Sequence, residues 1–452
     1  MTFDVLIIGG GQAGVPLAHD LAGAGQQVAL AERKDLGGSC INFGCTPTKA
    51  AIASARVAHL ARRASEFGLR VPSVEVDFPA VLARAREVAA ESRRGLDRGL
   101  EGKENPRLLR GHARLDGRDG ERFRVRVGDE MVTAAQVVLD TGTRTLIPPI
   151  DGLAEVDFID SGNWLDRAEL PAHLAMIGGG YIGLEMGQFY RRMGSRVTVI
   201  EGSGQVAGHE DEDVATALRE RLAAEGIEFR LRTRVARVGR RAGGVTLALG
   251  GEELGATHVF VATGRRPNTG DLGLETVGVE VSDHGIVKVD ERLATNIAGV
   301  WAAGDIRGGP MFTHTSWDDY RVLLSQLAGD GARTTDRVVP YAVFTDPELG
   351  RVGLTEREAR AAGRPVKVAR FEMKKNGKAC EIGEPEGFIK VVADAETGQL
   401  LGAAVLAAEG AEIVHSYIDL MNARAPYQVL RDAVHIHPTL AEAVQSAVKA
   451  LD

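Results

Sequence analysis

Cysteine is scarce in this sequence of 452 residues, which has only three, and two of them, Cys40 and Cys45, lie five positions apart. A secreted scaffold held by disulfides would spread many more along the chain, so a lone close pair indicates redox or metal chemistry. Long apolar runs are also missing, since none approaches the roughly 20 residues that span a bilayer. The first residues show neither the basic start nor the small-residue cleavage site of a secretory signal. We therefore expect a cytoplasmic protein with no membrane partner.

Basic residues are too few to balance the acidic ones, and the formal net charge is −8. No positive field would attract phosphates, which argues against general nucleic-acid binding. Hydrophobic residues make up 44% and charged residues 26%, as in ordinary globular proteins. The length exceeds that of one ordinary core, so we expect about two to four domains.

A strand, a glycine-rich turn and a helix follow one another twice along the chain. In the first unit we expect a strand over 4–8, a turn over 9–14 and a helix over 15–24, and the next strand, 27–31, ends at Glu32. The second unit has a strand over 173–177, a turn over 178–183, a helix over 184–193 and a strand over 196–200 that ends at Glu201. The repeat predicts an α/β protein with two Rossmann-like nucleotide-binding domains.

The glycines of these turns have distinct tasks in a dinucleotide-binding unit. The first permits the tight turn, the second lets a pyrophosphate approach the backbone, and the third allows close helix packing. In chain order these are Gly9, Gly11 and Gly14 in the first unit, and Gly178, Gly180 and Gly183 in the second. The alternative, an ordinary glycine turn, is disfavoured because the flanking strands, helices and acids all match.

The acid at the end of each second strand is placed to accept hydrogen bonds from a ribose. In the first unit this residue is Glu32. At the second site the carboxylate of Glu201 favours NADH over NADPH, because it repels a 2′-phosphate. The nearby basic residues Arg191, Arg192 and Arg196 could offset that preference.

The pattern changes after about residue 340. Residues 387–406 are typical of a hairpin, and helical spacing follows over 411–421 and 439–451. A third, α+β region therefore completes the chain.

Residues 37–49 contain the cysteine pair and are the most informative stretch. Two thiols this close can form an intramolecular disulfide, and the pattern predicts a helix over 50–65 with Pro47 in a favoured first-turn position. A helix N-terminus stabilises thiolate. A zinc half-site or a structural pair is the alternative, but Cys380 offers no partner spacing for zinc. We therefore favour a redox pair.

Near the carboxyl end, His437 is followed by Pro438, and Glu442 comes five residues after it. A carboxylate at this spacing could orient the imidazole and raise its basicity. From residue chemistry alone, an acid–base role and a structural one stay equally open. His435 has no such acid and is expected to be structural.

Several of these motifs resemble the FAD-dependent pyridine nucleotide–disulfide oxidoreductases, the family of dihydrolipoamide dehydrogenase, glutathione reductase and mercuric reductase. The resemblance covers nearly the whole chain and is carried by residues 37–49, 303–305 and 309–314. It implies an FAD-binding domain over 1–150 and 271–338, an NAD(P)-binding domain over 151–270, and a dimerisation domain over 339–452. It also implies FAD and NAD(P)H as cofactors and a homodimer.

The resemblance further implies individual roles. Cys40 would be the interchange thiol and Cys45 the charge-transfer thiol, with Lys49 and Glu185 paired beside the flavin, and His437 with Glu442 would serve the partner subunit's site. The residues implied to bind FAD, besides those of the first turn and Glu32, are Thr141, Gly142, Asp305, Met311 and His314. Those implied to bind NAD(P), besides the second turn and Glu201, are Tyr181 and Gly264. No resident metal site is implied.

The sequence also departs from its relatives. It lacks the C-terminal cysteine pair of mercuric reductases, and Asp140 stands where the family usually has alanine before Thr141. Residues 46–48 and 316–321 differ from dihydrolipoamide dehydrogenases. The chain is most similar to a mercuric-reductase-like branch, akin to reactive-chlorine-resistance reductases.

The expected reaction passes hydride from NAD(P)H through FAD to the Cys40–Cys45 disulfide and on to a small-molecule or protein disulfide. The alternatives are reduction of metal ions such as Hg(II) and Cu(II) or other oxidants, and a lipoamide-dehydrogenase-like role within a larger complex.

Overall fold

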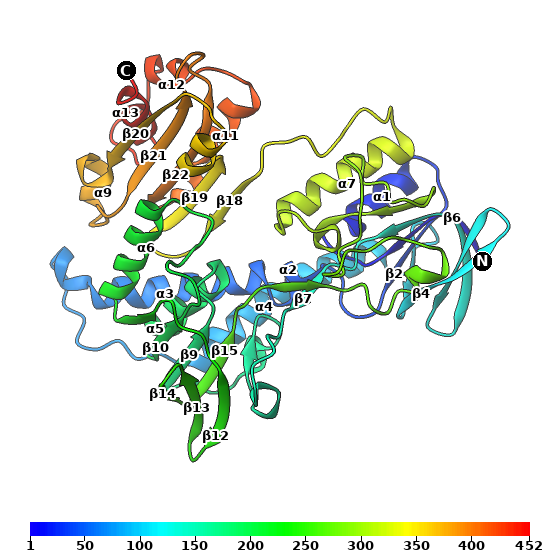
Figure 1. Cartoon of the computed structure of the whole chain (residues 1–452), viewed down its shortest axis with the longest axis horizontal. Helices are drawn as coiled ribbons and strands as arrows, with labels where there is room; N and C mark the ends of the chain where they lie inside the picture. The colour runs from blue at the N-terminus through cyan, green and yellow to red at the C-terminus, as the bar shows by residue number, and fades with distance from the viewer.

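The computed structural model describes residues 1–452, which form three bodies, each built on its own sheet (Figure 1). The first two bodies have mainly parallel sheets covered by helices, and the third has an antiparallel sheet. The predicted α/β class is thereby confirmed. None of the helices combines the length and the apolar character that a membrane span needs.

The first body lies at the right of Figure 1 and contains seven strands in the order β3-β2-β1-β6-β5-β4, with β17 also paired to β6. These are β1 (Thr2–Ile8), β2 (Val28–Glu32), β3 (Arg107–Arg110), β4 (Ala113–Asp119), β5 (Arg122–Val127), β6 (Glu130–Leu139) and β17 (Val300–Ala302). Strand β1 runs parallel to β2 and β6, and Ile8 is paired with Leu139. Helices α1 (Gly14–Gly23) and α7 (Thr313–Ala328) pack together on this sheet.

The second body has five parallel strands in the order β11-β10-β9-β15-β8. These are β8 (Ile159–Asp160), β9 (His173–Ile177), β10 (Arg196–Ile200), β11 (Ile227–Arg230) and β15 (His258–Val261). Helices α5 (Tyr181–Met193) and α6 (Glu212–Ala224) accompany them, with a meander of β12 (Arg237–Arg241), β13 (Gly244–Leu249) and β14 (Glu252–Ala256). The short strands β7 (Thr143–Thr145) and β16 (Arg265–Pro267) pair where the chain passes between the two bodies.

The third body, at the upper left of Figure 1, is an antiparallel sheet in the order β18-β19-β22-β21-β20. Its strands are β18 (Pro340–Val343), β19 (Glu348–Gly353), β20 (Val366–Glu372), β21 (Phe388–Asp394) and β22 (Leu400–Ala407). Every residue of β22 is buried. The surrounding helices are α8 (Glu356–Ala361), α9 (Gly377–Glu381), α10 (Gly410–Ile413), α11 (His415–Asn422), α12 (Gln428–Asp432) and α13 (Ala443–Lys449).

Two helices predicted in this third body are shorter than expected. The helix over 411–421 is divided into α10 and α11, and the N–H of Tyr417 donates to Val414 O, three residues back, which tightens the turn there. The helix over 439–451 begins only at Ala443, because the N–H groups of residues 443–445 donate to carbonyls three residues back instead of four.

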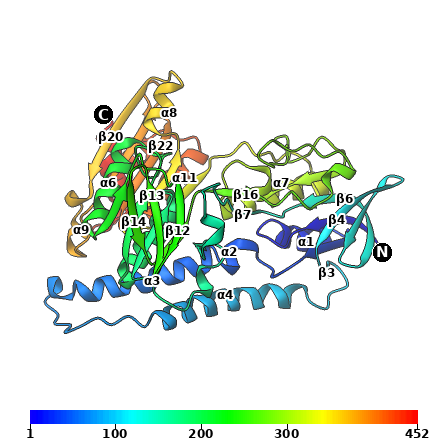
Figure 2. The same cartoon turned by 60° about the horizontal axis from the view of Figure 1, so that its bottom comes forward.

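A long helix pair, α3 (Cys45–Arg62) and α4 (Phe78–Leu100), runs along the lower edge of the molecule (Figure 2). The predicted start of α3 at residue 50 is wrong, since the helix begins at Cys45 itself. Before it, the short helix α2 (Gly38–Asn42) starts after Gly37, whose φ of 96° suits glycine. Its last residue, Asn42, donates through Nδ2 to Leu36 O and Gly38 O, which holds the end of α2 against the turn that precedes it.

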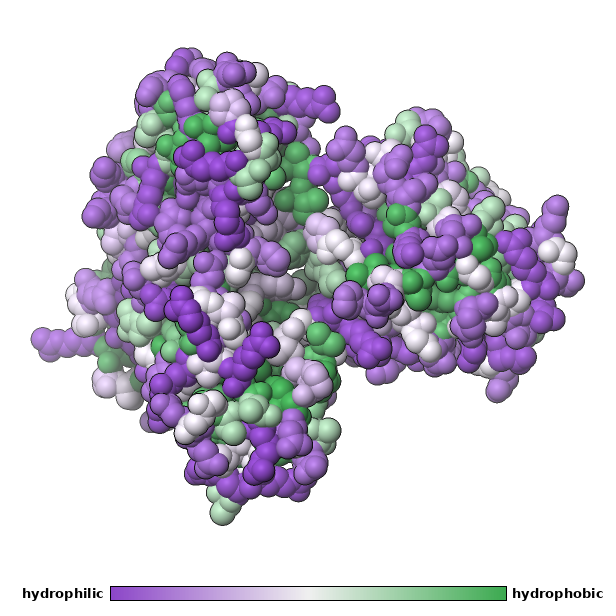
Figure 3. Space-filling model, viewed as in Figure 1, coloured by the Kyte–Doolittle hydropathy of each residue, from purple (hydrophilic) through white to green (hydrophobic).

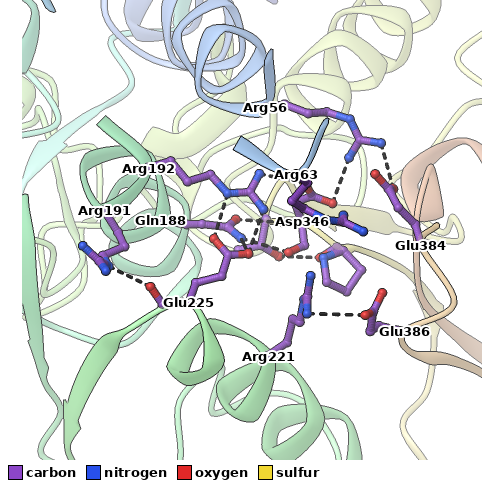
Figure 4. Close-up of polar contacts among 12 residues, drawn as sticks. Arg56, Arg63, Gln188, Arg191, Arg192, Arg221, Glu225, Asp346, Glu384 and Glu386 are labelled. Atoms are coloured by element: carbon purple, nitrogen blue, oxygen red, sulfur yellow. Dashed lines mark hydrogen bonds and ion pairs between the residues drawn. The ribbon is translucent and has the colours of Figure 1, made fainter. Parts of the chain in front are cut away.

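A largely buried network of ion pairs joins helix α3, the second body and the third body (Figure 4). Arg192 of α5 lies 2.7 Å from Glu225 Oε1 and 2.7 Å from Asp346 Oδ2, and only 4% of its side chain is exposed. Arg56 of α3 lies 2.8 Å from Asp346 Oδ1 and 2.9 Å from Glu384 Oε2. Asp346 and Glu384 belong to the third body, so the network ties this body to α5 and to α3, the helix that begins at Cys45.

We expect Arg192→Met to lower the free energy of unfolding by about 3–5 kcal/mol, because Glu225 and Asp346 would stay buried without this cation. The matched control is Arg196→Met, whose side chain is 58% exposed beside Glu228 and which should cost less than about 1 kcal/mol. Denaturant unfolding measures both, and equal losses would contradict the importance of the buried network.

Candidate active site

A cavity of about 1300 Å³ opens between the three bodies, and the hollow is visible between the left and right parts of Figure 3. Its walls come from the first glycine turn, from α2 and α3, from the start of α5, and from residues 337–344 and 411–422 of the third body. Cys40 and Cys45 both line it. A large cavity in which polar and apolar side chains converge is the expected form of a cofactor site.

One end of the cavity is the first glycine turn. A Cβ on Gly14 would overlap Gly9 O, and a Cβ on Gly11 would lie 2.8 Å from Asp140 Oδ2, so neither position tolerates a side chain. Glu32 accepts hydrogen bonds from the N–H of Gly10 and of Lys34, both at 2.8 Å. The carboxylate is thereby fixed at the end of β2, on the cavity wall.

The two cysteines are free thiols here. Cys40 lies in α2 and Cys45 is the first residue of α3. The Sγ of Cys45 lies 3.4 Å from the hydroxyl of Thr313, the first residue of α7. Cys45 is therefore at the N-terminus of one helix and in contact with the N-terminus of another, and both helix ends favour negative charge. Cys380 lies in α9 and does not line the cavity.

The pKa values of the two thiols are shifted in opposite directions. A hydrogen bond from Cys40, aided by the charge of Lys49 and the hydroxyl of Thr313, lowers the pKa of Cys45 from 9 to about 6. The same hydrogen bond, together with burial, raises the pKa of Cys40. In the reduced pair the negative charge therefore resides on Cys45 while Cys40 keeps its proton.

The thiolate of Cys45 should persist down to about pH 6 in the reduced protein. Because its folded-state pKa is depressed, the thiolate and the stability it contributes are lost as pH falls through that value. The ultraviolet thiolate absorbance of the wild type minus that of Cys45→Ser measures this titration. Lys49→Met should move its midpoint to higher pH, and an unchanged midpoint would contradict the assigned cause.

Lys49 and Glu185 form an ion pair at the wall of the cavity, with Nζ 2.8 Å from Oε2. The other oxygen of Glu185 accepts the N–H of Phe344 at 2.8 Å, and Lys49 Nζ lies 4.6 Å from the centre of the Phe344 ring. Burial acts to lower the pKa of Lys49, but Glu185 and Cys45 outweigh it and raise the pKa. Lys49 is thus a fixed cation beside the thiolate.

Another part of the cavity wall is formed around residues 305–315. Asp305 accepts a hydrogen bond from Thr143 Oγ1 at 2.7 Å. His314 stacks on Phe312 with ring centres 5.4 Å apart and contacts Pro340 O at 2.6 Å through Nε2. The other cavity-lining residues of this wall that the sequence singled out are Met311, Thr141 and Gly142.

The second glycine turn connects β9 to α5. Glu201 accepts the N–H of Gly179 at 2.8 Å and of Ser203 at 2.7 Å, which repeats the arrangement at Glu32. Tyr181, the first residue of α5, lines the cavity with its ring centre 6.1 Å from that of Phe312. Burial raises the pKa of Tyr181 to about 12. The remaining residues assigned to this site are Gly178, Gly180 and Gly183 in the turn and Gly264 just after β15.

The three arginines considered beside Glu201 are engaged elsewhere. Arg191 donates to Glu225 O, Arg192 belongs to the buried network, and Arg196 pairs with Glu228 at 2.8 Å. None of the three contacts Glu201 in this arrangement.

His437 and Glu442 contact each other, with Nδ1 3.1 and 3.0 Å from the two carboxylate oxygens. Glu442 is the residue just before α13, not one turn inside a helix as the sequence predicted. The His437 side chain is 75% exposed. Neither residue lines the cavity of its own chain, so within one chain the dyad and the cysteines are separate.

Comparisons with known proteins agree with this geometry. The profile described as "Pyridine nucleotide-disulphide oxidoreductase" matches residues 3–319, and that of its dimerisation domain matches residues 339–448. The chain belongs to the pyridine nucleotide-disulphide oxidoreductases.

Individual relatives of the family are similar over the whole length. A dihydrolipoyl dehydrogenase of Thermus scotoductus is 36% identical, with 100% of this chain and 97% of the relative covered. The probable pyridine nucleotide-disulfide oxidoreductase RclA of Escherichia coli K12 is 33% identical, with 98% of each covered. A solved Cu(II) complex of the HOCl-induced flavoprotein disulfide reductase RclA from Escherichia coli superposes with a TM-score of 0.92 at 32% identity, covering 100% of both chains.

As a member of this family, the chain is a disulfide oxidoreductase that uses FAD and NAD(P)H. It also carries the dimerisation domain of the family. The predicted family, activity and cofactor classes are thereby confirmed. The residues present fit FAD, because the side-chain-free turn at Gly11 and Gly14 leaves room for a pyrophosphate and both cysteines line the same cavity.

Two residues of this pyridine nucleotide-disulphide oxidoreductase site were not assigned a role from the sequence. Thr313 contacts Cys45 although 268 positions separate them. Asp140 was noted only as a departure from the family, yet its Oδ2 accepts the N–H of Gly14 at 2.8 Å. No local pattern marks either contact, since both depend on how α7 and β6 are packed.

Proposed function

We propose that this chain reduces a disulfide through its own Cys40–Cys45 pair, with two distinct thiols. The observation that carries the proposal is the different placement of the two thiols: Cys45 begins α3 and contacts Thr313 at 3.4 Å, whereas Cys40 lies within α2. This placement lowers the pKa of Cys45 and raises that of Cys40. Bound FAD would supply the two-electron transfer from the nicotinamide to the Cys40–Cys45 disulfide. The predicted domain boundaries, with FAD bound by 1–150 and 271–338, NAD(P) by 151–270 and dimerisation through 339–452, are part of the proposal.

The dithiol then exchanges with the substrate. Cys40, once deprotonated, attacks one sulfur of the substrate disulfide, and the substrate S–S bond breaks to give a mixed disulfide and one thiolate. Cys45 attacks Cys40 next, which re-forms the internal disulfide and releases the second substrate thiolate. We assign to His437 of the partner subunit the removal of the Cys40 proton and its transfer to the leaving thiolate. Glu442 would hold that imidazole through Nδ1.

We further propose NADH as the preferred nucleotide, in a cytoplasmic homodimer. Glu201 supports NADH because its carboxylate sits at the end of β10, where it would repel a 2′-phosphate. The engagement of Arg191, Arg192 and Arg196 with other partners supports the same choice. The exposure of His437 and its distance in the fold from its own cavity support an assembly in which it serves another chain.

A second candidate is reduction of metal ions or oxidants by the same dithiol. The observation that favours it is the likeness to RclA. That protein is described as HOCl-induced, and the solved structure is described as its Cu(II) complex. A third, a lipoamide-dehydrogenase-like component of a larger complex, follows from relatives named dihydrolipoyl dehydrogenase.

An acceptor screen separates these functions. The NADH-reduced holoenzyme is mixed with lipoamide, small disulfides, a lipoyl-domain protein, Cu(II) or Hg(II), and NADH oxidation is followed for the wild type and for Cys40→Ser. We expect turnover with a disulfide that is lost in Cys40→Ser. Turnover with Cu(II) or Hg(II) but with no disulfide would reject the proposal in favour of metal reduction.

A further inference from the structure

A buried carboxyl group, Asp140, lies directly beneath the first glycine turn. It follows the last residue of β6, and its own N–H donates to Ile8 O at 2.8 Å, so it is held beside the end of β1 where the turn begins. Only 7% of the residue is exposed, and it belongs to the cavity wall.

The two carboxylate oxygens have different surroundings. Oδ2 accepts the N–H of Gly14, the first residue of α1, and α1 has no side-chain cap of its own. Oδ1 makes no hydrogen bond and lies 2.9 Å from the position of a Cβ on Gly304. Asp140 thus occupies part of the helix N-terminus that a dinucleotide pyrophosphate uses.

The charges around Asp140 are mostly of its own sign. Asp305, Asp319 of α7 and Glu32 of β2 face it, and burial, followed by these acids, raises the pKa of Asp140 well above its usual value. The nearby cations are directed at other acids, with Arg307 and Arg337 on Asp319, and Arg265 at 3.7 Å from Asp305. No cation pairs with Asp140, whose one stabilising partner is the Gly14 N–H.

We propose that Asp140 couples FAD binding to the uptake of one proton: its carboxylate caps α1 in the FAD-free protein and becomes a neutral carboxylic acid when the pyrophosphate occupies the turn. In the balanced binding step, the protein with ionised Asp140 takes up one FAD and one H⁺, and the product is the FAD complex with protonated Asp140. It rests on the proposed FAD site of the first body and is independent of the acceptor. The physical reason is that two phosphate charges and a buried carboxylate cannot share one helix N-terminus without an added cation.

Linkage fixes the sign of the effect. In the pH range in which Asp140 is ionised in the free protein but protonated in the complex, the Kd for FAD rises by up to about tenfold for each unit of pH. Below that range the affinity does not change with pH through this group.

The test is FAD binding by the full-length apoprotein between about pH 6 and pH 9, followed by fluorescence, with calorimetry in buffers of different ionisation enthalpy to count protons. The wild type should take up as much as one proton per FAD and bind more weakly as pH rises. Asp140→Asn, which resembles the neutral acid, should bind FAD with little pH dependence and no proton uptake. Asp116→Asn, an exposed acid of the same body, should behave as the wild type.

Equal proton uptake by the wild type and Asp140→Asn would overturn the proposal, as would an Asp140→Asn protein that folds but binds no FAD at any pH. If Asp140→Asn does not fold, Asp140→Ala replaces it with the same expected result. The rate at which FAD leaves the holoenzyme gives an independent reading, since it should increase with pH in the wild type and in Asp116→Asn but not in Asp140→Asn. These readouts do not depend on turnover, so they can fail or succeed apart from the proposed disulfide reduction.

Discussion

Cys45→Ser should abolish disulfide reduction, with kcat/KM for the disulfide acceptor lowered by on the order of a thousandfold or more, because the internal disulfide can no longer form. The variant should keep FAD, since the glycine turn and Asp305 are untouched. Serine is close in size to cysteine, and the helix N-terminus at residue 45 is retained. Steady-state NADH oxidation with the acceptor and the flavin absorbance of the purified protein measure the two outcomes.

The matched control is Cys380→Ser, which removes a thiol in α9 that does not line the cavity. It should leave both acceptor reduction and FAD content unchanged. Undiminished disulfide turnover in Cys45→Ser would show that the electrons leave by another route, and the proposed exchange would then be wrong.

His437→Ala should lower kcat/KM for the disulfide by about 10²–10⁴-fold, the range expected for loss of a general acid–base group. Glu442→Gln should have a smaller effect of the same kind, because an amide oxygen can still accept from Nδ1 but bears no charge. Activity with a one-electron acceptor that does not need the dithiol should be preserved in both variants. Loss of that activity as well would indicate a structural defect.

Subunit exchange tests where the imidazole acts. When Cys45→Ser and His437→Ala homodimers are mixed and allowed to exchange chains, each mixed dimer should regain one intact site, with Cys45 from one chain and His437 from the other. If the dyad served its own chain, every site of the mixed dimer would lack one group. No recovery after proven exchange would therefore contradict a site shared between subunits.

Regular elements with strong local patterns were predictable in detail. Strands β9 and β10 have the bounds that the apolar runs before and after the second glycine turn predicted, 173–177 and 196–200. The ends of helices were less predictable because they depend on the backbone hydrogen bonds of a single turn. The helix α3 begins at Cys45, soon after the turn of α2, and α13 begins late because the N–H groups of residues 443–445 donate to carbonyls three residues back.

For the cysteine pair as well, some properties depend on neighbouring residues in the sequence and others on residues far along the chain. Its spacing and its place before a helix are properties of a short stretch, so the sequence by itself determined the redox chemistry, the two nucleotide-binding turns and the family. The different proton affinities of the two thiols come instead from Lys49, held by Glu185 136 positions away, and from Thr313, 268 positions away. The exposure of His437 outside its own cavity and the burial of Asp140 under the glycine turn were likewise decided only by the tertiary structure. The physical reason is that charge and burial act through space, and which distant groups meet depends on how β6, α5 and α7 pack around the cavity.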